Sequence, residues 1–151
     1  MRALIQSQLS TSLDSRIVTE LLDAHSEAKR NYYLGGLRLS EVEGGRFCEA
    51  AFRILEQITT GAFTPLGTQI NTEQLINRLS QIPNGAFHDS VRLHIPRALR
   101  LVYDIRNKRD AAHLADGIDP NLQDATLVIN TIDWILAELL NFDKPMSAEQ
   151  I

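Results

Sequence analysis

The chain has 151 residues, of which 44% are hydrophobic and 23% are charged, and its formal net charge is −4. This length suits one domain, and the composition is that of a globular protein, which excludes an intrinsically disordered chain. The single cysteine, Cys48, excludes an intramolecular disulfide or a cysteine-based metal cluster, and no apolar run is long enough to cross a membrane.

Polar residues directly follow Met1–Ile5, which interrupts any secretory signal, so we expect a cytoplasmic protein. We divide the chain into a frayed segment at 1–13, a helical domain at 14–142 and a tail at 143–151. Within the domain, apolar residues recur every three or four positions, which is typical of helices. In chain order, the predicted helices cover about 15–34, 40–60, 72–82, 96–109 and 120–142.

The ends of these helices carry residue types that cap or stop a helix. Gly35-Gly36 and Gly61 follow the first two helices, where the left-handed position after a helix favours glycine. The residues expected to open the later helices are Asn71 or Thr72, then Pro96, and finally Asp119-Pro120.

Gly44 and Gly45 lie near the start of the 40–60 helix, where they either weaken it or permit close approach of a partner helix. No segment alternates with a period of two for more than a few residues, so a sheet is not expected. The sequence therefore predicts an all-α fold, a single bundle of about five helices.

Positive charge is concentrated in one part of this acidic chain. Between Arg92 and Arg109 there are six basic residues and one acid. A run of this kind is commonly a solvated helix face. Most of the basic residues are arginine, which binds phosphate in a bidentate manner and equally serves surface ion pairs.

One pair of residues at and just beyond the end of this segment points to chemistry. Six residues separate Arg106 from His113, and the polar Asn107 directly follows the arginine. As a bare pattern this is weak, because a chain of this composition contains roughly one such pair by chance. Its position adds weight, since it falls at the end of the penultimate helix, before a turn and a long final helix.

The sequence from Ile105 to His113, followed by Asp119-Pro120-Asn121, resembles that of bacterial HEPN-like domains of phage-defence and abortive-infection proteins. Two earlier segments, Gly45–Glu49 and Thr59–Gly61, resemble the same group. The resemblance covers roughly residues 15 to 142 and implies a HEPN-like helical bundle.

The resemblance implies an endoribonuclease that needs no metal ion or other cofactor and leaves a 2′,3′-cyclic phosphate. Its catalytic residues would be Arg106, His113 and Asn107. Arginine stays cationic and holds two phosphate oxygens at once, histidine exchanges a proton near neutral pH, and asparagine orients the substrate or a partner. Further basic residues expected to bind RNA are Arg109, Lys108 and Arg100.

The spacing of the pair has a mechanical consequence. Seven residues return a helix to nearly the same face but move about 10.5 Å along its axis, which is far for two side chains that share one phosphate. Either the helix breaks near Asp110, so that His113 folds back, or two chains share the site. In HEPN proteins the two motifs meet across a homodimer, so we expect a homodimer. Arg109 and His113, one turn apart, form a tighter pair.

Each site residue also has a plainer interpretation. Asn107 is as well suited to cap a helix as to act in an active site. An ion pair at the protein surface is the commoner role for an arginine such as Arg109. Glu49 lies on an amphipathic helix, where glutamate is usually solvated. HEPN enzymes often place a polar residue from an earlier helix near the site, which makes Glu49 a possible accessory residue. His113, in a loop, is otherwise an ordinary exposed histidine.

The remaining histidines and the tryptophan are interpreted as structural residues and not as parts of the site. His25 lies among charged residues and is expected at the surface. His88 and His94 have no partner at metal-ligand spacing, so no metal site is expected. Trp134 belongs to the core or to a dimer interface.

The leading hypothesis is a toxin-type or phage-defence ribonuclease whose partners are an RNA substrate, a second copy and an antitoxin or defence-system protein. Many HEPN toxins are controlled by a nucleotidyltransferase that modifies a tyrosine two residues after the motif histidine, and Leu114-Ala115 do not support that control. The alternatives are a non-catalytic HEPN-like module that binds RNA, a nucleotide or a protein, and a structural helical dimer.

Overall fold

The computed structural model describes the backbone at residues 1–115 and 121–142 and the side chains at 1–107 and 121–141. Over these ranges the fold is all-α, as predicted, and none of the helices there has the length and apolar character needed to cross a membrane. In chain order the helices are α1 (Arg2–Ser10), α2 (Ser15–Tyr33), α3 (Leu37–Thr60), α4 (Thr72–Ser80), the π-helical turn η1 (Ser90–His94), α5 (Ile95–Ala115) and α6 (Leu122–Phe142).

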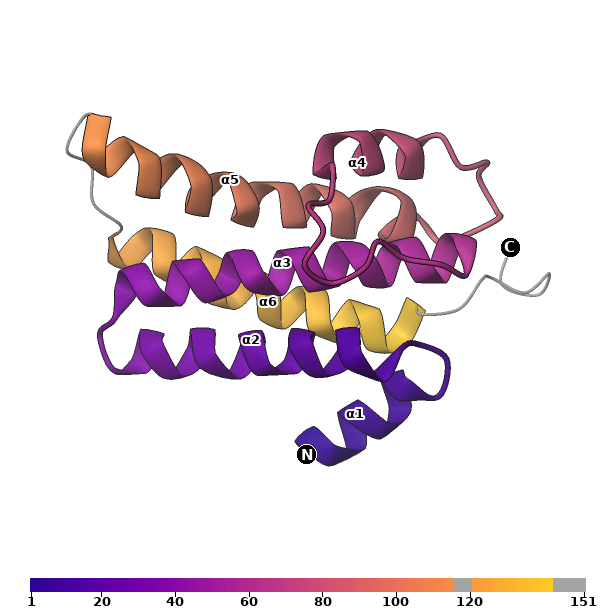
Figure 1. Cartoon of the computed structure of the whole chain (residues 1–151), viewed down its shortest axis with the longest axis horizontal. Coiled ribbons are helices and arrows are strands. Elements are labelled where there is room, and N and C mark those ends of the chain that lie inside the picture. The colour runs from indigo at the N-terminus through magenta and orange to yellow at the C-terminus, as the bar shows by residue number, and fades with distance from the viewer. Residues whose placement is uncertain (116–120, 143–151) are drawn as a thin grey trace.

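Helix α3 is the centre of the bundle. In Figure 1, α2, α3, α5 and α6 run along the long axis of the molecule, with α4 beside α5 and α1 at the lower edge. Helix α3 packs against α2, α5 and α6, so side chains are buried around most of its circumference. Phe47 and Phe52 are fully buried, and each contributes about 1.5–3 kcal/mol to folding by leaving water.

Side chains cap two of the helix N-termini, and one of these caps, Asn71, is among the residues expected to open a helix. The Asp14 side chain accepts a hydrogen bond of 2.8 Å from the backbone N–H of Arg16 at the start of α2. The Asn71 side chain accepts one of 3.0 Å from the N–H of Gln74 at the start of α4. Gly61 ends α3 with a φ of +81°, the left-handed conformation expected of a C-terminal glycine.

The start of α6 differs from the prediction. Asp119 and Pro120, the expected cap, lie outside the described residues, as does the tail at 143–151. The side chain of Asn121 instead accepts a hydrogen bond of 2.8 Å from the N–H of Asp124. Asparagine is as good a cap as aspartate, so residue type alone did not select between the two positions.

The expectation of a frayed segment at 1–13 is wrong. Residues 2–10 form α1, which packs on α2 and α6 and whose Leu9 is fully buried. The Gln6 amide also donates a 2.8 Å hydrogen bond to the Thr19 hydroxyl of α2. Ile5, Leu9 and Leu13 recur every four residues, and this spacing anchors the helix although most residues around them are polar.

Pro96 is not the first residue of its helix, contrary to the prediction. Helical structure begins with η1, in which the N–H of Ile95 bonds to the carbonyl of Ser90, five residues back, and Pro96 follows as the second residue of α5. Proline removes one α-helical hydrogen bond because it has no N–H, and a wider π turn accommodates that loss. The Ser90 hydroxyl fixes this turn to α6 through a 2.9 Å hydrogen bond to Glu138.

The two glycines of α3 allow its neighbours to approach closely. A Cβ atom at Gly44 would stand 2.7 Å from a methyl group of Val128 in α6 and 3.6 Å from one of Val102 in α5. Helix α3 continues through both glycines without a break. Of the two roles considered for the pair, close approach is the one that the structure supports.

Gly44→Ala is expected to lower the free energy of unfolding by about 1–3 kcal/mol, because the new methyl group overlaps the buried Val128. The gain in helix propensity, about 1 kcal/mol, offsets only part of this cost. Chemical denaturation measures the free energy of unfolding of the parent and of each variant. In the Gly44→Ala/Val128→Ala double variant the overlap is gone, so its cost should be smaller than the sum of the single costs. Additive costs would contradict the contact.

Candidate functional site

Arg106 of α5 lies against Gly45 of α3. A Cβ atom at Gly45 would stand 2.5 Å from the Cδ of Arg106 and 3.0 Å from its Cγ and Nε. The arginine stem therefore rests on bare helix backbone, while 31% of the side chain stays exposed. A long cationic side chain that packs its stem and exposes its head is well suited to meet an anion.

Glu49 of α3 joins Arg106 to Tyr103. Its Oε1 lies 3.6 Å from the Nη1 of Arg106 and accepts a 3.1 Å hydrogen bond from the Tyr103 hydroxyl. The Cζ of Arg106 is 5.9 Å from the centre of the Tyr103 ring. Partly exposed contacts of this kind contribute up to about 1 kcal/mol each, so they orient the guanidinium more than they stabilise the fold. The predicted Arg106 and accessory Glu49 are thus brought together.

Tyr103 keeps its proton at neutral pH. Burial raises the pKa of Tyr103 above its ordinary value, the charge of Glu49 and the hydrogen bond to it raise the pKa further, and Arg106 and Asn107 act in the opposite direction. The protonated hydroxyl can therefore serve as the donor to Glu49. Asn107 is exposed and hydrogen-bonds to Tyr103. It does not cap α5, because that helix continues to Ala115.

His113 lies within α5, so the expected loop around it is wrong, and of the two alternatives for the site the helix break near Asp110 is not observed. The side chains of His113, Lys108 and Arg109 are outside the described residues. The continuous helix places position 113 on nearly the same face as Arg106, about 10.5 Å further along the axis. Folding back within one chain is therefore excluded as the way to bring the two residues together.

Arg100, a predicted RNA-binding residue, is engaged in an ion pair. Its Nε and Nη2 donate to the two carboxylate oxygens of Glu73 at 3.0 and 2.7 Å. About half of each side chain is exposed. Water and salt screen such a pair, so RNA can compete for this arginine at modest cost.

A cavity of about 440 Å³ lies beside the Arg106–Glu49 contact. Its walls come from α2, α3, α5 and the loop between α3 and α4, with Glu20, Arg46, Glu49 and Tyr103 among them. In Figure 1 this loop runs back along α3 before it reaches α4. Sequence analysis did not anticipate the cavity, because it depends on where this loop folds.

A second cavity, of about 480 Å³, adjoins the first. We call it the Asn107 cavity; its lining residues are Gln69, Ile70, Asn71, Thr72, Glu73, Tyr103 and Asn107. Gln69, Ile70 and Tyr103 line both cavities, so the two meet at the tyrosine. Tyr103 packs against the core, but it is only partly buried and also contributes to the candidate site.

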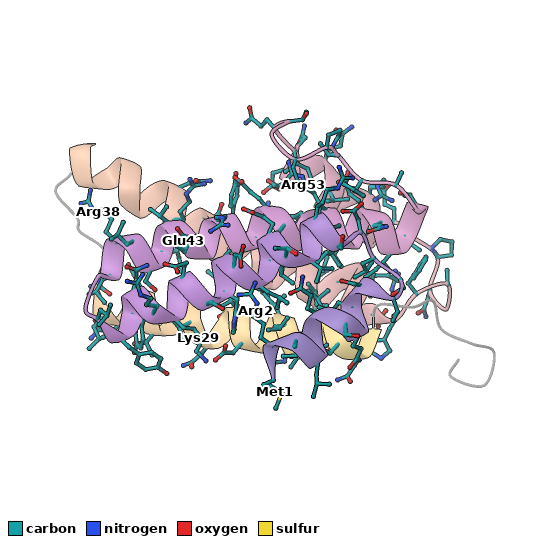
Figure 2. The ribbon with its side chains drawn as sticks, turned by 60° about the horizontal axis from the view of Figure 1, so that its bottom comes forward. Met1, Arg2, Lys29, Arg38, Glu43 and Arg53 are labelled. Carbon is teal, nitrogen blue, oxygen red and sulfur yellow. The ribbon has the colours of Figure 1, made fainter. Side chains whose placement is uncertain are left out.

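Arg53 holds the loop in place. Only 4% exposed, it donates hydrogen bonds to the backbone carbonyls of Thr64, Pro65 and Thr68, at 3.0, 3.4 and 2.6 Å, and to that of Glu49 at 3.1 Å. Figure 2 labels this arginine near the loop. The signal for it was present in the sequence, as a single arginine within the apolar run 50–55.

Arg46 is neutralised on the rim of the first cavity. It bonds to both carboxylate oxygens of Glu20, one of them at 3.0 Å, and to Glu43 at 3.0 Å. The hydrogen bond that Arg46 donates to Glu20 is the main cause that raises the pKa of Arg46 above its ordinary value. Nearby, burial raises the pKa of Cys48, whose thiol donates to the Leu99 carbonyl at 3.6 Å. That thiol is therefore not a nucleophile at neutral pH.

The other histidines do not join the site. His25 was expected at the surface, but only 18% of its side chain is exposed, because its Nε2 bonds to Asp133 of α6 at 2.7 Å. Lys29 binds the same carboxylate at 3.1 Å, and Figure 2 shows it on the side of α2 toward α6. Among the described side chains there is no group of three or more His, Cys, Asp or Glu residues placed to hold a metal ion.

No family model matches this sequence, and no curated protein or solved structure matches it either.

Replacing Arg53 with methionine is expected to release the loop, because three loop carbonyls and that of Glu49 lose their donor. Unsatisfied buried acceptors cost about 1–3 kcal/mol, measured as the free energy of unfolding in urea. Hydrogen exchange at residues 62–68 should become faster, while exchange within α3 changes little.

Arg30→Met is the matched control for this substitution, since Arg30 is exposed and pairs with Glu27 one turn away. Its effect on unfolding should stay within about 0.5 kcal/mol. If Arg53→Met left exchange in the loop unchanged, the holding role of Arg53 would be wrong.

Proposed function

We propose that the protein is a metal-independent endoribonuclease of the toxin or phage-defence kind, related to HEPN domains and active as a homodimer. One observation carries the proposal. Arg106, oriented by Glu49 and Tyr103 and partly exposed beside two cavities, lies on the same unbroken helix as His113.

The proposed reaction is an attack by the RNA on its own backbone. His113 takes the proton of a 2′-hydroxyl, whose oxygen forms a bond to the adjacent phosphorus while the bond from phosphorus to the 5′-oxygen breaks. Water or a second His113 supplies the proton that the departing 5′-oxygen takes. The products are a 2′,3′-cyclic phosphate and a 5′-hydroxyl. Arg106 binds the phosphate oxygens as their negative charge increases.

A second copy of the chain completes the site in this proposal. Arg106 and His113 lie about 10.5 Å apart along a continuous helix, which is too far for one phosphate to engage both within a chain. Asn107 orients the RNA, and Lys108, Arg109 and Arg100 attract its backbone. The antitoxin or defence-system partner expected from the resemblance belongs to the same proposal.

Helix α6 offers a face for the second copy. Its exposed positions Leu127, Asn130, Trp134 and Ala137 recur at intervals of three and four and carry no charge. Leu127 and Trp134 are 44% and 41% exposed, so Trp134 is not a core residue. An uncharged stripe of helical period can pack against the same stripe on a symmetry-related copy without like-charge repulsion.

A non-catalytic module that binds RNA, a nucleotide or a protein partner is the alternative. The observation that favours it is the pairing of cations near the cavities, because Arg46 and Arg100 both bind carboxylates. Paired cations produce a weaker field for a polyanion than their number suggests, which within this alternative favours a nucleotide or a protein over RNA.

His113→Ala and Arg106→Ala should each reduce cleavage of single-stranded RNA by roughly 100-fold or more, as losses of a general base and of a charge stabiliser do. The assay is gel analysis of a labelled RNA, with detection of the cyclic phosphate end. Cleavage should persist in a chelator. His94→Ala and Arg97→Ala, at exposed positions earlier along the same helical run, are the controls and should retain activity. If purified parent protein binds RNA and leaves it intact, the alternative function is correct.

Trp134→Glu should convert the dimer to a monomer, because two copies of the stripe would bring like charges together. Light scattering after size exclusion measures the mass, and ribonuclease activity should fall together with the dimer fraction. Leu101→Glu is the matched control, since Leu101 is 45% exposed and lies on α5 rather than on the stripe. A parent protein that is monomeric and fully active would contradict a shared site.

A further inference from the structure

The Asn107 cavity has the chemistry of a site for a planar, uncharged heterocycle. Most of the groups around it are neutral donors and acceptors, among them the amides of Gln69 and Asn107. Both of those side chains are exposed, and the buried Ile70 supplies an apolar surface. Amides can donate to and accept from the edge of a nucleobase, which is how unpaired RNA bases are read.

The aromatic wall of this cavity is fixed in orientation. The hydroxyl of Tyr103 donates to Glu49 at 3.1 Å, which limits rotation of the side chain. Tyr103 is only partly buried and lines the cavity together with Asn107. A ring held in this way is a suitable stacking surface for a base, because little conformational entropy is lost when the base binds.

The charges around the Asn107 cavity favour an anion, such as a phosphate, beside the cavity rather than inside it. Glu73, the one acid among its lining residues, has both carboxylate oxygens bonded to Arg100. Arg106 lies 5.9 Å from the centre of the Tyr103 ring and therefore stands beside the tyrosine wall. An uncharged pocket next to a partly exposed arginine matches a base linked to a phosphodiester.

We infer that the Asn107 cavity binds the nucleobase adjacent to the phosphate held by Arg106, and that it makes RNA cleavage selective for one base. This inference rests on the proposed ribonuclease function. The volume of the Asn107 cavity, about 480 Å³, lies within the range of cavities that enclose small organic ligands. Gln69 is the selecting residue, because it reaches the cavity from the loop and has no part in the proposed chemistry.

The test is cleavage of four labelled RNA pentamers that carry A, C, G or U at the central position and uridine elsewhere. The parent protein should prefer one base by about 10-fold or more in kcat/KM, the scale expected of a hydrogen-bonded base contact. Gln69→Ala should reduce this preference to about 3-fold or less and leave cleavage of the poorest pentamer nearly unchanged. Gln74→Ala, an exposed amide that lines a different cavity, should leave the preference intact.

Binding of the same pentamers with 2′-O-methyl groups separates this inference from the proposed function, because they cannot be cleaved. If the parent discriminates among them by fluorescence anisotropy and Gln69→Ala does not, the base site stands even where RNA is never cut. If RNA is cut without base preference, or if Gln69→Ala keeps the full preference, the base site is wrong and the ribonuclease proposal survives. If the parent neither cuts nor binds any pentamer, both fail.

Discussion

The close packing of α6 at Gly44 and of α5 at Gly45 of helix α3 determines the rest of the structure. At Gly44 a Cβ atom would overlap Val128 of α6, and at Gly45 it would overlap Arg106 of α5. A larger residue at Gly44 would push α6 outward, and one at Gly45 would displace the Arg106 side chain, whose place follows from the register of α5 against α3. That register sets Glu49 opposite Tyr103 and Arg106, so the candidate site is a direct consequence of how closely the helix backbones pack.

Burial and the available partners give the arginines of this chain different roles. Arg53, with four carbonyl oxygens around it, acts as a structural support, and Arg46 is bound by two carboxylates. Arg92, within the basic segment, has only 11% of its side chain exposed and bonds to Asp89 and to the Ile82 carbonyl. The count of basic residues between 92 and 109 therefore overstates the field that an RNA would meet, and the local environment of Arg106 matters more than the segment's net charge.

The sequence predicted features that depend on local structure and missed those that depend on distant contacts. The caps at Asp14 and Asn71 and the glycine at 61 follow from the few residues beside each helix end. The cavities depend on a loop that Arg53 draws back over α3, a long-range contact that periodicity does not encode. The part of Tyr103 in the cavities was missed for a related reason, since its helical spacing indicates only that it packs against the core, as it does. Glu49 and Arg106, both named as candidates from the sequence, do lie 3.6 Å apart.

The unbroken α5 helix constrains how any catalytic dimer of this chain can be built. If a phosphate meets Arg106 of one copy and His113 of the other, two-fold symmetry requires the reciprocal pair as well, so each dimer has two equivalent sites. For both pairs to meet, the two α5 helices must run antiparallel. The two sites are then separated along the helix axis by the same distance, about 10.5 Å, that separates Arg106 from His113 within one chain. The Asn107 cavity then lies next to Arg106 at each site, and the base it holds determines which phosphate reaches the opposite His113. The base-binding cavity and Arg106 would thus be supplied by one copy of the chain, and the general base His113 by the other.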